Sequence, residues 1–405
     1  MDNRVYWIWL SLCFSHGSGK PQQLVESEDA ASIYQNRQTI CQSVDYLTSR
    51  DGDRLCKISL ERAKLVLERC GELGIRVVTL NDPVYPEKLR HIYGAPLVLY
   101  VQGDISYLND VPAVAVVGTR EASQYGMNVT GNLSYQLAST GVTVVSGCAV
   151  GIDEYAHRGA LKAGGRTVGV LGCGHDVDYP AKNKNLKQEI LKRGGALIGE
   201  LPPGTPVNGR YFPVRNRIMA GLSDGVLVTE APAKSGALIT ARLANDLDRD
   251  VFCVPPYNIF DTKYLGVVPL LREGAKAVFD VTDILEEYTV QYEGRIDLER
   301  ITRPVIVPAN KESEPELKVA GESAYRGSQK VASDSHQTQK EKFPAPEELT
   351  DKQKKLYDIL TFDPVHADDL AREVGWEIYE VLSVLTELEL LELVTAQSGR
   401  RYSLS

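Results

Sequence analysis

The stretch Val-Ala-Val-Val-Gly-Thr-Arg, residues 114–120, decides the fold. Its apolar residues favour a buried strand, and the small residues after them favour a tight turn before a helix. The pattern recurs, with apolar runs at Val114–Val117, Val142–Val145, Thr167–Leu171, Ala196–Gly199, Gly225–Thr229 and Val251–Val254. Helical stretches lie between them, among them Gly126–Ser139, Asp153–Ala163 and Ala237–Leu247. Because continuous apolar strands alternating with helices form a parallel sheet covered on both faces, we predict an α/β fold with a doubly wound, mostly parallel sheet.

The segments on either side of this α/β domain have other patterns. Residues 1–100 show helical spacing of apolar side chains, for example at Leu60, Ala63 and Leu67, which predicts a small helical domain. The α/β domain is expected over residues 101–288. Residues 289–345 are polar and poor in aromatic side chains, which predicts a flexible linker.

Residues 346–405 have the pattern of a winged helix. Helices are expected at Lys352–Leu360, Ala367–Val374 and Ile378–Leu388, and the strands of a wing at Leu393–Ala396 and Arg401–Leu404. The third helix of such a domain usually reads DNA. Here it carries several glutamates and no Lys or Arg between Trp376 and Glu392, a composition that repels phosphate. We therefore favour a protein-contact or packing role for this domain over duplex reading.

Composition limits the possible functions. The 405 residues carry a net charge of −9, so any nucleic-acid site must be a local basic patch. The seven cysteines include no Cys-x-x-Cys pair, which argues against a disulfide framework and a zinc site and fits a reducing cytoplasm. The apolar stretch Tyr6–Phe14 is expected to be a buried helix rather than a signal peptide. No run reaches the roughly 20 apolar residues that span a bilayer, and no pattern indicates a metal or a cofactor.

One stretch mixes arginines with aromatic residues: Asn-Gly-Arg-Tyr-Phe-Pro-Val-Arg-Asn-Arg, residues 208–217. Guanidinium groups bind phosphates, and aromatic rings stack on unpaired bases, so the mixture favours single-stranded nucleic acid over a duplex. The candidate residues are Arg210, Phe212, Arg215, Asn216 and Arg217. A purely structural alternative is an arginine-rich helix start that surface carboxylates hold, with Phe212 in the core.

Three turns at predicted strand ends could bind an anion. Gly118, Thr119 and Arg120 end the first strand, Ser146–Gly151 follow the second, and Ser235–Thr240 follow another. Glycines, free amides at a helix start and an arginine all suit a phosphate. Because ligands bind at the carboxyl ends of such strands, the turns together could form an anion-binding rim, although each fits an ordinary tight turn. Neither a Walker A loop nor a Gly-x-Gly-x-x-Gly motif is present.

Asp153 and His157 lie four residues apart and share one face of a predicted helix. A hydrolase would pair them with Ser146, but no Gly-x-Ser-x-Gly elbow accompanies these residues. Of the two interpretations, we favour a structural hydrogen bond between Asp153 and His157.

The series of motifs resembles one known family. From about Val114 to Ala275 the chain contains, in order, VAVVGTR, SGCAVGIDEYAHRGAL, TVGVLGCGHDVDYP, GELPPGTP, FPVRNRIMAGLS, VTEAPAKSGALITARLA and VFCVPP. This series is similar to the DNA-processing protein DprA (Smf) family. The resemblance implies an extended Rossmann-like fold between a SAM-like or helix-hairpin-helix-like domain and a winged helix. It also implies a cytoplasmic, non-enzymatic homodimer that binds and protects incoming single-stranded DNA and loads the RecA recombinase in natural transformation and recombination.

The resemblance also assigns roles to residues. A backbone phosphate would lie in a pocket formed by Gly118, Thr119, Arg120, Ser146, Gly147, Ser235, Gly236 and Thr240. Arg215 and Arg217 would contact or shape the phosphate channel, and Phe212 would meet a base. Lys182 would be a further candidate for backbone contact. The chain departs from the family pattern at Pro256, where glycine is usual, and at Tyr264–Val268, in the region through which family members dimerise.

Two other classes of function stay open. Rossmann-type phosphoribohydrolases of the Lonely Guy type cleave nucleoside monophosphates and carry a Pro-Gly-Gly-x-Gly-Thr turn. The corresponding strand end here, Lys234–Thr240, lacks the double glycine. A transcription regulator would act through the winged helix, and the acidic third helix counts against that interpretation.

Overall fold

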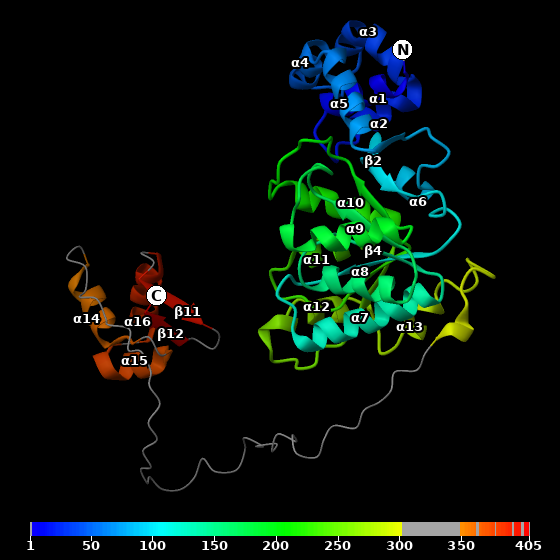
Figure 1. Cartoon of the computed structure of the whole chain (residues 1–405). Helices are drawn as coiled ribbons and strands as arrows, with labels where there is room; N and C mark the ends of the chain where they lie inside the picture. Colours follow the sequence, from blue (N-terminus) through cyan, green and yellow to red (C-terminus); the bar gives the residue numbers. More distant parts are fainter. Residues whose placement is uncertain are drawn as a thin grey trace. The chain divides into compact units, whose positions relative to one another are not determined.

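The computed structural model describes residues 2–301, 349–361, 364–376, 378–390, 393–397 and 401–404. The chain divides into two compact units, Met1–Val307 and Pro308–Ser405 (Figure 1). Most of the predicted linker, residues 302–345, lies outside the described residues.

The first unit begins with a helical segment. It comprises α1 (Arg4–Cys13), α2 (Lys20–Ser27), α3 (Ala30–Ser43), α4 (Ser49–Lys57) and α5 (Leu60–Glu72). Helix α1 lies in the core of this segment, where Trp7 and Trp9 are buried. The indole nitrogen of Trp9 donates to the carbonyl oxygen of Ile58 at 2.9 Å, which ties α1 to the α4–α5 turn. The prediction of a buried helix here is confirmed.

A nine-stranded sheet follows. Its strands are β1 (Arg76–Thr79), β2 (Val98–Gly103), β3 (Ala113–Val117), β4 (Thr143–Ser146), β5 (Thr167–Leu171), β6 (Ala196–Gly199), β7 (Gly225–Val228), β8 (Asp250–Cys253) and β9 (Lys276–Ala277). The spatial order is β1-β2-β6-β5-β4-β3-β7-β8-β9. All neighbours from β6 to β9 are parallel, whereas β2 is antiparallel to both β1 and β6. The mostly parallel sheet predicted from the sequence is confirmed. The helical segment ends before residue 100, because the unpredicted strand β1 begins at Arg76.

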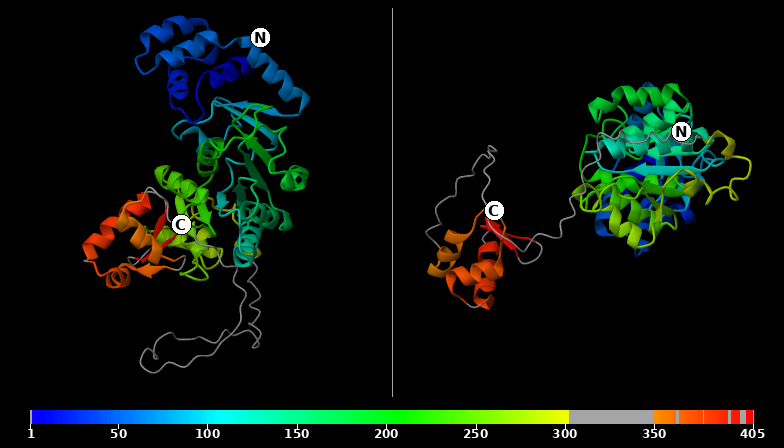
Figure 2. Two further views of the ribbon diagram at one scale, coloured as in Figure 1. Left: turned by 90° about the vertical axis from the view of Figure 1, so that its left-hand side faces the viewer. Right: turned by 90° about the horizontal axis from the view of Figure 1, so that it is seen from below.

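Helices cover both faces of the sheet (Figure 2). Successive residues of a strand point to opposite faces. In β3, Ala115 and Val117 share a core with α10 (Tyr211–Leu222) and α11 (Gly236–Asp246). Val114 and Val116 share another core with α7 (Gln124–Ser139) and α8 (Ile152–Lys162). Shorter elements complete the unit: α6 (Glu87–Arg90), η1 (Ala181–Asn183), α9 (Lys184–Lys192), η2 (Thr262–Tyr264), α12 (Val267–Arg272), α13 (Thr282–Leu285) and η3 (Leu298–Arg300).

The first residues of the predicted linker pack against this unit. Tyr292 is buried, and its hydroxyl donates to Oδ1 of Asp224 at 2.8 Å. The amide of Asp297 donates to the carbonyl oxygen of Thr140 at 2.9 Å. Asp224 and Thr140, the partners of Tyr292 and Asp297, are distant in sequence, so the polar composition of residues 289–301 did not predict these contacts.

The second unit is a winged helix built from α14 (Asp351–Ile359), α15 (Ala367–Val374), α16 (Ile378–Leu390), β10 (Val365–His366), β11 (Val394–Gln397) and β12 (Arg401–Leu404). The predicted two-stranded wing has a third, short strand, because β10 pairs with β12.

Acidic residues of α16 contact α14: Nζ of Lys352 is 3.4 Å from Oε1 of Glu380, and the Gln353 amide donates to Glu387 at 2.8 Å.

Candidate nucleic-acid interface

The site lies where the order of the strands reverses. From β3, the chain adds β4, β5 and β6 on one side and then returns to add β7 and β8 on the other. Ligands of open α/β sheets bind beyond the carboxyl ends of the strands at such a switch point. There the turns after β3 and β7 border a cavity of about 280 Å³, here named the main cavity. Residues that the sequence predicted and that line it are Gly118, Thr119, Arg120, Phe212, Arg215, Asn216, Ser235, Gly236 and Thr240.

Arg215 is a buried cation in the wall of the main cavity, with 7% of its surface exposed. Its Nη1 donates to the carbonyl oxygen of Val170 at 2.6 Å and contacts Sδ of Met219 at 3.5 Å. No carboxylate of the described residues lies within 4 Å of the guanidinium, and its Nε has no partner there. Burial lowers the pKa of Arg215, while the charge of Asp153 acts to raise it. Because a buried charge needs compensation, this position favours a bound anion.

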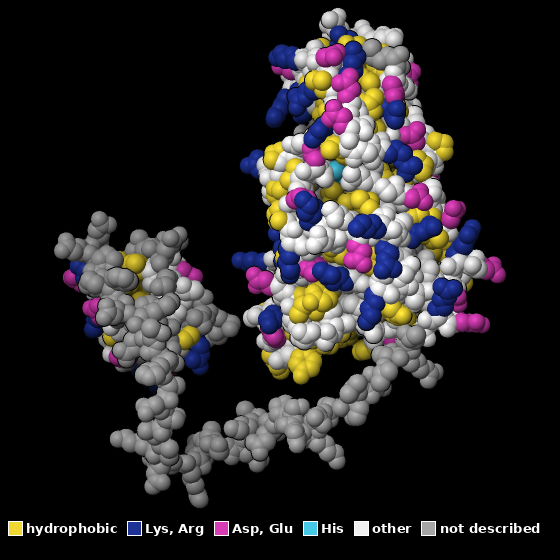
Figure 3. All heavy atoms as spheres, in the orientation of Figure 1, with side chains coloured by type: hydrophobic (Ala, Val, Ile, Leu, Met, Phe, Trp, Pro, Cys, Tyr) yellow, Lys and Arg dark blue, Asp and Glu magenta, His cyan; other side chains and the backbone are white. Residues whose placement is uncertain are grey.

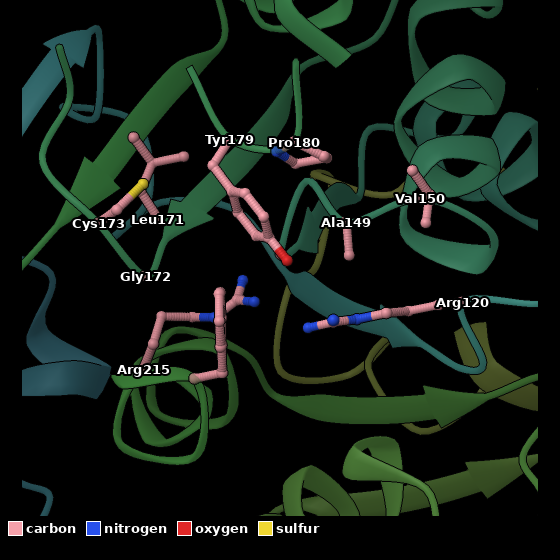
Figure 4. Close-up of a pocket in the computed structure, with 11 residues that line it drawn as sticks. Arg120, Ala149, Val150, Leu171, Gly172, Cys173, Tyr179, Pro180 and Arg215 are labelled. Atoms are coloured by element: carbon pink, nitrogen blue, oxygen red, sulfur yellow. The ribbon is translucent and has the colours of Figure 1, made fainter. Parts of the chain in front are cut away.

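Arg120 and two aromatic rings lie next to Arg215. Arg120 is exposed, and its guanidinium carbon lies 5.2 Å from the centroid of the Phe212 ring. The ring of Tyr179 lies 5.6 Å from the same centroid. Arg120 and Arg215 point toward one another, and the Tyr179 hydroxyl points toward the space between them (Figure 4). All four residues line a smaller cavity of about 40 Å³, and Arg120, Phe212 and Arg215 also line the main cavity.

Sequence reasoning missed Tyr179 and Lys234 as site residues. For Tyr179, the available signal was an aromatic residue directly before a proline and close to Lys182. Lys234 is exposed and lines the main cavity. It follows β7 directly through a short turn, so its position at the rim depends on the strand order.

The turns after β3 and β7 hold each other in place. The Thr119 amide donates to the carbonyl oxygen of Glu230 at 2.7 Å, which joins the two turns. A Cβ at Gly118 would lie 2.5 Å from Cγ1 of Ile152, so this glycine is required for packing rather than for a ligand. The Ser235 hydroxyl caps α11 by accepting from the Ala237 amide at 3.2 Å. Thr240 is buried, and its hydroxyl has no partner among the described residues.

The predicted anion nest after β4 already holds a carboxylate of the protein. The amides of Gly147 and Ala149 donate to Oδ2 of Asp153 at 3.0 and 3.3 Å. Gly147 is needed for a different reason, because a Cβ there would lie 1.9 Å from Nη1 of Arg215. Ser146 is buried and donates to the carbonyl oxygen of Val116 at 2.7 Å, so its hydroxyl does not line the cavity.

The predicted hydrogen bond between Asp153 and His157 is wrong. His157 Nδ1 lies 2.7 Å from Oγ1 of Thr167, and its Nε2 lies 3.4 Å from Sγ of Cys148. Asp153 is in the first turn of α8, where its carboxylate accepts from the preceding amides instead of reaching along the helix. Burial lowers the pKa of His157 to about 3 and raises the pKa of Cys148 to about 12, so both groups are neutral at pH 7.

Acidification is expected to destabilise the fold through His157. Its pKa is about 3 in the folded protein and about 6.5 when unfolded, so its contribution is complete above pH 6.5 and falls as the pH is lowered toward 3. At pH 5 the loss should be about 2 kcal/mol. Urea unfolding at pH 7 and pH 5 measures it. His157→Gln should reduce the difference by this amount, whereas His91→Gln, at a histidine with 72% side-chain exposure, should not. Equal pH dependence in the parent and His157→Gln would contradict the assignment.

Three predicted basic residues line neither cavity. Arg217 is buried, and its Nη2 donates to Oε2 of Glu200 at 2.5 Å. Lys182 is exposed, with its Nζ 3.5 Å from Oε2 of Glu154. Arg210 is exposed and directly precedes α10. The structure thus separates Arg215 from the other basic residues of the region.

The family model for DNA recombination-mediator protein A matches residues 76–289, just over half of the chain. The chain belongs to this family. A model of the DprA winged helix domain matches residues 340–400. The family identified from the motifs is therefore confirmed.

Individual relatives agree with the family models. The protein Smf of Synechocystis sp. is 34% identical over 348 residues, which cover 83% of this chain and 82% of the relative. The DNA processing protein DprA of Bacillus subtilis is 40% identical over 230 residues, which cover 56% of this chain and 77% of the relative. The X-ray structure of DprA from Streptococcus pneumoniae superimposes with a TM-score of 0.59 at 33% identity, covering 71% of this chain and 98% of that one.

Within the described ranges the chain has neither a membrane-spanning helix nor a cluster of metal ligands. No helix there is long and apolar enough to cross a membrane. In the same residues, no group of three or more His, Cys, Asp or Glu side chains is placed to hold a metal ion. All seven cysteines lie within these ranges and are free thiols.

Proposed function

We propose that this DNA-processing protein binds single-stranded DNA in the main cavity, without sequence preference. The observation that carries the proposal is the buried guanidinium of Arg215, which has no carboxylate within 4 Å among the described residues. Arg120 and Lys234 add two cations to the lining, against the single carboxylate of Asp153, which backbone amides already hold. A phosphate would compensate these charges.

The neighbouring rings support a single strand over a duplex. Phe212 lines both cavities, next to Tyr179 and Arg120. An unpaired base can stack on such a ring while its phosphate meets the arginines, whereas a duplex hides its base faces. Contacts to phosphates and to base faces carry little sequence information, so sequence preference should be low.

Arg120→Ala is expected to weaken binding to labelled oligo-dT about tenfold, uniformly across sequences, because it removes one phosphate contact. The slope of log affinity against log salt concentration should also be smaller by about one, because one fewer counterion is released on binding. Fluorescence anisotropy with oligo-dT and a matched duplex over a salt series measures both. Arg193→Ala removes an exposed arginine that lines neither cavity and is the matched control. Parent-like binding by Arg120→Ala, or equal binding of the duplex, would refute the proposal.

We propose further that the protein acts without catalysis. Cys148 and His157 are close to one another, but the pKa values given above keep them as a neutral thiol and imidazole, and both are buried. The Glu230 carboxylate accepts from the Ser123 hydroxyl at 2.8 Å and is fully buried. Incubation with a panel of nucleoside monophosphates tests the alternative. Release of free base or ribose phosphate would show a nucleotide-processing enzyme instead.

The proposal includes a cytoplasmic homodimer that loads the RecA recombinase in recombination and natural transformation. Supporting it, Tyr257, Ile259 and Phe260 after β8 are 78%, 59% and 86% exposed, and hydrophobic side chains gather at the lower end of this unit (Figure 3). Exposed apolar patches of this kind mark protein interfaces. Tyr264, at the departure from the family pattern, is buried with its hydroxyl 3.2 Å from Oγ of Ser123, so it is not part of this patch.

Two measurements test these partners. Sedimentation equilibrium should give a dimer for the parent and a monomer for Phe260→Asp, and a monomeric parent would exclude the homodimer. On DNA covered by single-strand-binding protein, the chain should shorten the lag before RecA begins to hydrolyse ATP. An unchanged lag would exclude RecA loading.

A further inference from the structure

A second group of cations lies in the helical segment, apart from the main cavity. Between α4 and α5 is a groove of about 460 Å³, here named the α4–α5 groove. Its lining includes four cations, Arg50, Arg54, Lys57 and Arg62, and one carboxylate, Asp53. Lys and Arg side chains gather at this edge of the helical segment (Figure 3). The groove is therefore positive on a chain whose net charge is −9.

Three of these cations are available to a ligand. Arg50 and Arg62 are exposed, and neither guanidinium has a hydrogen-bond or ion-pair partner in the part of the chain that the structure describes. Lys57 pairs with Asp53 at 2.9 Å, but both side chains are more than 60% exposed, and such pairs are weak. Arg54 differs, because its Nη2 donates to the carbonyl oxygens of Leu12 and Phe14 at 2.8 and 3.4 Å.

Contacts connect the α4–α5 groove with the wall of the main cavity. Arg54 holds the end of α1 by donating to the carbonyl oxygen of Phe14. His16 follows Phe14 by two residues, and its ring lies 6.0 Å from the ring of Tyr211. His16 and Tyr211 line a small cavity together with Arg215. Arg215 in turn lines the main cavity. Through these residues the segment after α1 links Arg54 of the groove to Arg215 of the main cavity, within the first unit.

We propose that the α4–α5 groove is a second binding site for the phosphate backbone of a single DNA strand whose other part occupies the main cavity. This inference rests on the proposed function. The groove lining has exposed cations and no aromatic side chain, which suits backbone phosphates rather than bases. When one part of a long strand occupies the main cavity, the rest of the strand is held near the groove at a high effective concentration. A strand that reaches both sites therefore binds with higher affinity. A strand confined to the main cavity gains nothing from the groove.

The test compares two lengths of DNA. The variant Arg50→Gln/Lys57→Gln/Arg62→Gln removes the three available cations and keeps Arg54, which supports the fold. Relative to the parent, it should bind an oligo-dT of about 30 nucleotides at least tenfold more weakly, with a salt slope lower by about two to three. It should bind an oligo-dT of about six nucleotides as the parent does.

The matched control is Lys162→Gln/Lys192→Gln/Arg193→Gln, which changes the net charge equally at exposed positions outside the groove and both cavities. It should bind both lengths as the parent does. Arg62→Gln alone removes a side chain that has no partner within the described ranges, and it should weaken binding of only the long oligonucleotide, about twofold to threefold. This single variant keeps the test valid if the triple variant fails to fold.

The outcomes separate the two proposals. If the parent binds neither oligonucleotide, the proposed function is wrong. If the parent binds both, and the folded triple variant binds the long one with unchanged affinity, the proposed DNA site in the main cavity is retained. The proposed second site in the α4–α5 groove is then wrong. A loss of the long oligonucleotide by the matched control as well would also overturn it, because net charge alone would explain the effect.

Discussion

Arg215→Ala is expected to lower the affinity for oligo-dT about 100-fold, the largest effect of any single substitution in the main cavity. A charge-assisted hydrogen bond to phosphate contributes about 1.5–3 kcal/mol, and this guanidinium is buried where water screens it little. Fluorescence anisotropy at fixed salt measures the affinity. Arg215→Lys keeps the charge but loses the fork of donors and should give an intermediate loss of about tenfold.

Folding stability provides the control for Arg215→Ala. The substitution leaves the carbonyl oxygen of Val170 without its partner, which is destabilising. It also removes a buried cation whose pKa burial lowers and whose Nε has no partner among the described residues, which is stabilising. Because these two effects oppose each other, the free energy of unfolding in urea should change less than the free energy of DNA binding. A folded variant with parent-like affinity would show that phosphate does not bind beside Arg215.

Arg217→Ala is expected to have the opposite profile, with a loss of about 3–5 kcal/mol in the free energy of unfolding. It leaves Glu200, whose side chain is only 12% exposed, without its partner at 2.5 Å. The variant protein that remains folded should bind oligo-dT within about twofold of the parent, because Arg217 lines neither cavity.

A double-mutant cycle completes this prediction. Arg217→Met combined with Glu200→Gln removes both charges, so it should restore a large part of the stability that Arg217→Ala loses. Urea unfolding of Arg217→Met, of Glu200→Gln and of the double variant measures the coupling. Additive losses would contradict a direct ion pair, and a selective loss of DNA affinity in folded Arg217→Ala would move this residue to the phosphate site.

The different surroundings of the two arginines follow from helix geometry. In α10, residues 215 and 217 are two positions apart, which turns their side chains by about 200° around the helix axis. Arg215 therefore faces the main cavity, while Arg217 faces Glu200 and the loop before α2, where a Cβ at Gly17 would lie 3.2 Å from its Nε. The motif Arg-Asn-Arg indicates two cations but does not say which one has a carboxylate partner.

The sequence by itself determined the alternation of strands and helices, because apolar runs of strand length and helical spacing are local properties. It also placed Gly118–Arg120 and Ser235–Thr240 at strand ends, and parallel order brought them to one cavity. Only the tertiary structure decided the rest. In the folded chain the Gly147 amide donates to Asp153, and the Ser146 hydroxyl donates to the carbonyl oxygen of Val116. Tyr179 lies beside Phe212, and Arg217 pairs with Glu200. Each of these contacts depends on the position of another side chain or backbone group in the folded chain, which local composition and spacing do not encode.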